Sequence, residues 1–149
     1  MKTSTPKPPS VRGLERLLAV VAAMACLFIT IAIWRDVSTR QGMWPLPGLY
    51  FVELPAVAIL GALAFLVGHR YTARITWAAA GIYVAFGLLG AFSVGLCYAP
   101  IAIMFIMLAV LVMVRQEEPF LQSFAPFLIA AIAQAGLMLL AIRLLAGAQ

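Results

Sequence analysis

Five long apolar stretches, almost free of charged residues, follow one another along this chain. They cover Leu17–Trp34, Leu49–Gly68, Ile75–Phe92, Ala99–Val114 and Phe127–Leu145. As a helix with a rise of about 1.5 Å per residue, each is about long enough to cross a hydrocarbon layer about 30 Å thick. The sequence therefore predicts an all-α integral membrane bundle of five transmembrane helices joined by short loops.

The overall composition points to the same class of protein. Hydrophobic residues make up 65% of the chain and charged residues 10%, against about 45–50% and 25% in a typical soluble domain. A small water-soluble domain has too much surface to hide that apolar excess. We therefore expect a multi-pass protein of the cell membrane, with the lipid bilayer as its main partner.

The net charge of +5 does not indicate nucleic-acid binding. The ten basic residues sit at the ends of the apolar stretches, and no basic run carries interleaved aromatic residues. Basic residues beside membrane spans set orientation and contact anionic headgroups. We expect no nucleic-acid partner.

The chain divides into residues 1–16 and residues 17–149. The first segment is basic and proline-rich, so we expect it to be disordered in isolation. The second is the five-helix transmembrane domain. The first apolar stretch, Leu17–Trp34, is longer than the hydrophobic region of a usual signal peptide, which favours an uncleaved signal anchor.

Residues 75–114 form an apolar run without a single charge. As one helix the run would be about 60 Å long, twice the hydrocarbon thickness, so it must fold back. Gly90, Ser93, Gly95 and Pro100 mark the turn, and Pro100 suits the first turn of the following helix. We expect a tight hairpin here, with Tyr98 in the interfacial aromatic belt.

The distribution of Lys and Arg predicts the orientation. With the amino terminus inside, seven basic residues lie inside and three outside. This arrangement places the carboxyl terminus outside. After the fourth span, the amphipathic segment Phe120–Pro126 is expected to rest on the headgroups, with Pro126 starting the fifth span.

Glu53 is the one carboxylate inside a predicted span. Ionisable groups within a bilayer are costly and often mark proton or ion pathways. Glu53 lies only about 6 Å below the start of its span. At that depth it can reach interfacial water or pair with Arg35 or Arg40, so both a structural role and a transport role stay open.

Gln134 lies near the centre of the fifth span. A buried amide in lipid needs a hydrogen-bond partner, usually on a neighbouring helix, and such bonds contribute roughly 0.6–2 kcal/mol. Joining two helices is the first interpretation, and lining a substrate path is the second. Glu53 and Gln134 are the candidate polar residues within the membrane.

Other chemistry-bearing residues are few. His69 is the only histidine, and Cys26 and Cys97 have no metal-ligand spacing. No catalytic set, P-loop or metalloprotease motif is present, so we expect no catalytic residue, no cofactor and no metal. Small residues recur at four-residue spacing, as in Gly81/Ala85 and Ala131/Ala135, a spacing that permits close helix approach.

Two functions follow from these observations. The first is a non-enzymatic component that packs with its own copies or with a larger membrane complex. The second is a small solute or ion carrier or channel that uses Glu53 and Gln134. A shared aqueous cavity lined by both residues would favour transport, whereas separate structural contacts would favour packing.

Overall fold

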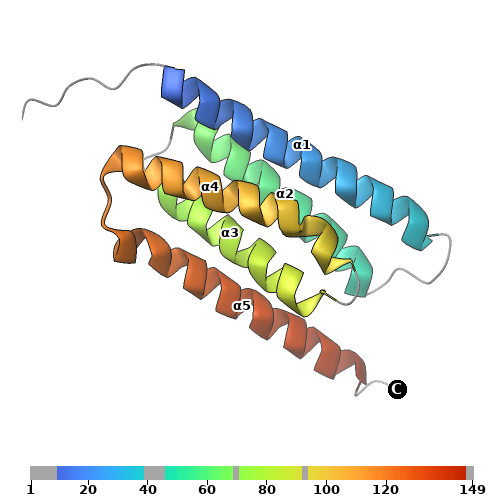
Figure 1. Ribbon diagram of the computed structural model, residues 1–149. Helices are drawn as coiled ribbons and strands as arrows, with labels where there is room; N and C mark the ends of the chain where they lie inside the picture. Colours follow the sequence, from blue (N-terminus) through green and yellow to red (C-terminus); the bar gives the residue numbers. More distant parts are fainter. Residues whose placement is uncertain (1–9, 39–45, 69–70, 92–93, 147–149) are drawn as a thin grey trace, which may run out of the picture.

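The described part of the chain is all-helical. The computed structural model describes residues 10–38, 46–68, 71–91 and 94–146, and within them every regular element is a helix (Figure 1). Five helices are long and apolar enough to cross a membrane, which confirms the predicted helical class. The elements are α1 (Ser10–Ser38), α2 (Leu46–Val67), α3 (Thr72–Leu89), the short 3₁₀ helix η1 (Gly95–Tyr98), α4 (Ala99–Gln116) and α5 (Phe120–Ala146).

Successive helices run in opposite directions, and α3 holds the bundle together. Helix α1 packs against α2 and α4, and α3 packs against α2, α4 and α5. Helix α5 lies on the outer side of α3 and runs in the same direction (Figure 1). The starts of α1, α3 and α5 therefore lie at one end of the bundle, together with the ends of α2 and α4.

Aromatic rings fill the centre of the bundle. Tyr83 on α3 stacks on Phe105 of α4, with ring centroids 5.4 Å apart and an interplanar angle of 11°. Tyr98 is fully buried and stacks on Tyr83 at 6.4 Å. Tyr98 was expected in the interfacial belt, and that expectation is wrong, because η1 turns this ring inward against α3.

The connection between α3 and α4 is the tight turn that the sequence predicts. Gly90 caps α3, and its carbonyl accepts a 2.8 Å hydrogen bond from the Gly95 N–H. A Cβ on Gly95 would lie 2.5–2.7 Å from backbone atoms of Gly90, so the two backbones touch where no side chain fits. Pro100 lies in the first turn of α4. Ser93, also assigned to this turn, lies outside the described residues.

Helix α1 begins earlier than its apolar stretch. Ser10–Arg16 are helical in the folded bundle, whereas the disorder expected for residues 1–16 concerns that segment in isolation; residues 1–9 lie outside the described part. The polar start of the helix is stabilised by tertiary contacts: Glu15 is 2% exposed and pairs with Arg115 of α4. A prediction based on local composition could not include a partner one hundred residues away.

Helix α5 is continuous through Pro126. The sequence placed Phe120–Pro126 on the headgroups as a separate segment, and the structure corrects this: Phe120–Ala146 is one helix with Pro126 inside it. The proline removes one helical hydrogen bond. Aromatic packing holds the helix on both sides of it, because Trp77 of α3 meets Phe124 at 5.3 Å and Phe127 at 5.9 Å, edge to face.

Helices α3 and α5 approach each other closely at Gly81. A Cβ on this glycine would lie 2.3 Å from the Phe127 carbonyl oxygen and 3.2 Å from the Ala131 nitrogen. Only a residue without a side chain permits that distance between two helix backbones. The small residues Gly81 and Ala131, noted for their spacing in the sequence, thus lie at this contact.

Candidate functional site

The two polar residues that the sequence selects within the membrane contact each other. Glu53 on α2 and Gln134 on α5 are separated by 81 positions, yet the Gln134 amide Nε2 donates a 3.2 Å hydrogen bond to the Glu53 Oε2. Gln134 is 3% exposed and Glu53 is partly exposed. The contact joins two helices that share no loop.

Gln134 is a partner that the sequence did not suggest for Glu53. From the sequence, Glu53 could reach interfacial water or pair with Arg35 or Arg40, because only the preceding loop was known to be near. The structure shows Gln134 beside Glu53, and Arg40 lies outside the described residues. Which helices are neighbours depends on the bundle, and no sequence spacing revealed that α5 reaches α2.

A second set of polar groups lies buried between α1, α2, α3 and α4. The Tyr83 hydroxyl donates to the Leu54 carbonyl oxygen at 2.6 Å and lies 3.1 Å from Cys26 Sγ. Since that hydroxyl has one proton, the Cys26 thiol is the donor in the second contact. Thr30 Oγ1 and the Tyr98 hydroxyl lie 2.9 Å apart. These groups satisfy one another within the protein, as burial in an apolar interior requires.

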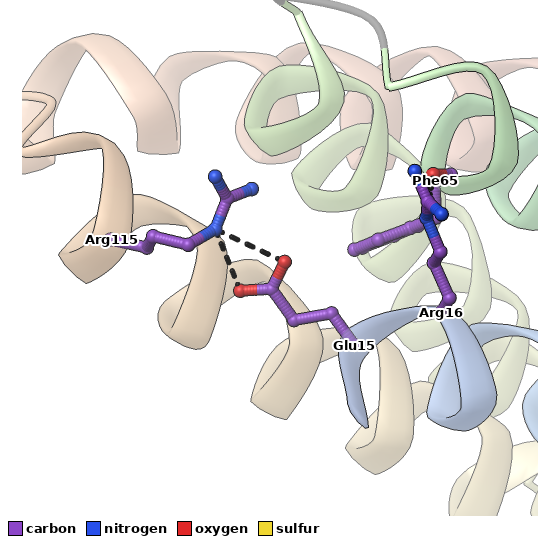
Figure 2. A network of polar contacts seen from close by, with 4 residues as sticks. All are labelled: Glu15, Arg16, Phe65 and Arg115. Atoms are coloured by element: carbon purple, nitrogen blue, oxygen red, sulfur yellow. Dashed lines mark hydrogen bonds and ion pairs between the residues drawn. The ribbon is translucent and has the colours of Figure 1, made fainter. Parts of the chain in front are cut away.

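An ion pair links α1 and α4 at one end of the bundle. The Arg115 Nε on α4 lies 2.9 and 3.1 Å from the two carboxylate oxygens of Glu15 on α1 (Figure 2). Nearby, the Arg16 Nε donates to the Phe65 carbonyl oxygen of α2 at 3.3 Å. This ion pair was not predicted from the sequence. The one sequence feature that points to it is Glu15, the only acidic residue in the first 35 positions.

A cavity of about 230 Å³ opens beside this ion pair, and we refer to it as the arginine cavity. It lies where α1 and α3 begin and where α2 and α4 end. Three of its lining residues are cationic and one is anionic. The polar lining residues are Arg12, Glu15, Arg16, Thr72, Arg115 and Gln116.

An apolar groove of about 480 Å³ lies between α1 and α2. Trp34, Phe51 and Pro55 form part of its wall, with Thr30 as its one hydroxyl-bearing residue. Neither this groove nor the arginine cavity is lined by Glu53 or Gln134.

The other candidate residues are scattered. Cys26 is buried in the bundle and Cys97 is exposed in η1, and both thiols are free. In the described ranges, no group of three His, Cys, Asp or Glu side chains gathers where it could hold a metal ion. His69 lies outside those ranges.

We compared the chain with models of known protein families, with curated proteins and with solved structures, and none of the three comparisons found a match.

Proposed function

We propose that this chain is a non-enzymatic packing component of a membrane assembly, formed with its own copies or with other proteins. One observation carries this proposal: Glu53, the carboxylate most able to mark an ion pathway, accepts a hydrogen bond from Gln134. Interhelical bonds of this kind stabilise membrane bundles by roughly 0.6–2 kcal/mol. Neither cavity described above includes these residues, which supports a structural role for the pair.

Helix α5 offers the surface for the contact with the assembly. Its outward side carries Ala133 and Gly136, both exposed, next to Ile132, which is 72% exposed. A Cβ on Gly136 would have no atom within 4 Å. Small residues on an open helix face let a second helix approach closely in lipid.

Site-specific photocrosslinking in native membranes tests the proposal. A photoreactive residue at Ile132 should give a discrete protein adduct, whereas one at Phe28, 75% exposed on α1, should react with lipid. Gly136→Leu should abolish the adduct by filling the open face, and Gly136→Ala should largely keep it. If Ile132 reacts with lipid alone, or if Gly136→Leu leaves the adduct unchanged, the assembly proposal fails.

The carrier or channel function is the second candidate, favoured by the partial exposure of Glu53. Transport coupled to protons requires a group that gains and loses charge. Purified protein in vesicles should show no flux driven by a pH gradient if Glu53 is structural. A flux in the parent that disappears in Glu53→Gln, with the fold intact, would assign the protein to transport instead.

We further propose that the protein lies in the cell membrane with its amino terminus inside and its carboxyl terminus outside. The alternating helix directions place Arg12, Arg16 and Arg115 at one end of the bundle, while Arg143 lies in the last turn of α5 at the other (Figure 1). The more basic end is expected inside. Reporters fused to the two termini should respond from opposite sides, and a response from one side would contradict five spans.

A further inference from the structure

We propose that the arginine cavity binds a phosphate oxyanion, supplied by the headgroup of an anionic phospholipid. The cavity is lined by three arginines, Arg12, Arg16 and Arg115, and by one carboxylate, Glu15. Three positive charges against one negative charge leave an excess of two. This inference rests on the membrane location and orientation proposed above but not on the assembly role, because Glu53, Gln134 and the outward side of α5 do not line the cavity.

The arrangement of Arg115 leaves it able to bind an anion. It contacts both oxygens of Glu15 through Nε alone, and its two terminal nitrogens lie on the far side of the guanidinium (Figure 2). Those nitrogens donate to no other group in the described part of the chain. Planar guanidinium groups bind phosphate oxygens through such paired donors. Glu15 thus orients the arginine without using its terminal donors.

The neighbouring arginines strengthen the site. Arg16 donates from Nε to the Phe65 carbonyl oxygen of α2, and its terminal nitrogens donate to no other described residue. Arg12 makes no ion pair with any described residue. Three guanidinium groups around one cavity repel each other, and a bound anion removes that repulsion.

Recognition in this cavity depends on the arginines. Gln116 also lines the cavity, but its Oε1 is inaccessible to solvent, so a ligand that enters the cavity does not reach that atom. A phosphatidylglycerol headgroup presents a phosphate with a net negative charge to the arginine donors, whereas the choline of phosphatidylcholine neutralises its phosphate.

The position and volume of the cavity suit a headgroup. The cavity lies at the end of the bundle, where a transmembrane helix meets the interfacial region, and basic pockets between membrane helices on the inner side bind lipid headgroups. At about 230 Å³ it is far larger than the 10–15 Å³ that one water needs. The phosphate can enter while the acyl chains remain in the surrounding lipid.

The test measures ligand binding to the full-length protein in a mild zwitterionic detergent. Short-chain phosphatidylglycerol, short-chain phosphatidylcholine and inorganic phosphate are titrated separately, with native mass spectrometry counting bound molecules. We expect one saturable phosphatidylglycerol site, and weak or no saturable binding of phosphatidylcholine. Each arginine contributes about a fivefold gain in affinity near an anionic lipid, so Arg12→Gln should weaken binding about fivefold and Arg12→Gln/Arg16→Gln about 25-fold.

The variants are chosen so that folding stays intact. Arg12→Gln leaves the Glu15–Arg115 pair in place. An unfolding transition measured for each variant in the absence of ligand shows whether it is folded like the parent. Arg143→Gln removes the same charge from the opposite end and should bind like the parent. Saturable binding of inorganic phosphate with the same variant dependence would support the site and identify its ligand as free phosphate. Equal binding of phosphatidylcholine, an unchanged double variant, or an equal loss in Arg143→Gln would overturn the proposal.

Discussion

Helices α3 and α5 lie side by side and run in the same direction, yet their surroundings are opposite. More than half of the α3 span is buried, against 11% of the α5 span, although α3 has the lowest mean hydropathy of the five spans. In a water-soluble protein, the most apolar helix would be expected in the centre. In this pair of helices the order is reversed, as expected for the membrane location proposed above, where lipid is the solvent.

Solvation by lipid explains why the less apolar helix is the buried one. In a bilayer, apolar side chains such as those on α5 are as well solvated by acyl chains as by protein, so burying them gives no hydrophobic gain. Hydroxyl groups and exposed backbone are poorly solvated there and need protein partners. Helix α3 carries such groups, including Thr72, Thr76 and Tyr83, and each is buried with a hydrogen bond. The contrast predicts that α5 is held by close packing against α3 and by its hydrogen bond to α2.

The largest expected effect is at Trp77. Its ring makes edge-to-face contacts with Phe120, Phe124 and Phe127 of α5, and each such pair contributes about 0.5–1.5 kcal/mol. Trp77→Ala should therefore lower the free energy of unfolding by about 1.5–4.5 kcal/mol, measured by titrating mixed micelles with a denaturing detergent.

Two variants control this measurement. Trp77→Phe keeps an aromatic ring and removes an indole N–H that is buried without a partner among the described residues, so it should retain most of the stability. Trp34→Ala removes a tryptophan on α1 that, in the part of the chain that the structure describes, meets the ring of Phe51 at 6.0 Å, and it should cost less. If Trp34→Ala costs as much as Trp77→Ala, the aromatic contact is not what holds α5.

The next effect is at the close approach of the two backbones. Gly81→Ala places a Cβ against the Phe127 carbonyl oxygen and must push the helices apart. Such overpacking costs about 1–3 kcal/mol. Gly136→Ala, on the open side of α5, makes the same chemical change and should stay within about 0.5 kcal/mol of the parent. Equal unfolding midpoints for the two variants would contradict the α3–α5 contact.

A smaller effect is expected at Gln134. Gln134→Leu removes the donor that α5 offers to Glu53 and should cost roughly 0.6–2 kcal/mol. Gln122→Leu changes an exposed amide on the same helix and is the matched control. The comparison uses the same detergent titration, and a loss at position 122 equal to that at 134 would remove the case for an interhelical bond.

The smallest effect is expected for Glu53→Gln. An amide keeps the shape and an acceptor oxygen for Gln134, so only the charge is lost, and an interfacial charge contributes at most about 1 kcal/mol. The variant should insert into the membrane, accumulate and unfold nearly as the parent does. Loss of the folded protein in this variant would show that the carboxylate has a further partner.

Much of the bundle could be predicted from local sequence. Five apolar stretches became five helices, and Gly90, Gly95 and Pro100 lie in the turn that was assigned to them, because helix length and turn chemistry are local properties. The boundaries at Ser10 and Phe120 were missed. Both helix ends are stabilised by contacts with other helices, and composition alone does not contain those contacts.

Some features of the candidate site could likewise be predicted from local sequence, and others could not. The sequence by itself selected Glu53 and Gln134, because a carboxylate or an amide in an apolar span stands out wherever its partner lies. Only the tertiary structure paired them, turned Tyr98 inward and brought Arg12, Arg16 and Arg115 around one cavity. The cost of burying a polar group is a property of the residue, so sequence reveals it. The partner that offsets this cost is determined by which helices pack together, and here that is decided by the close contact at Gly81 and by rings that meet only in the folded bundle.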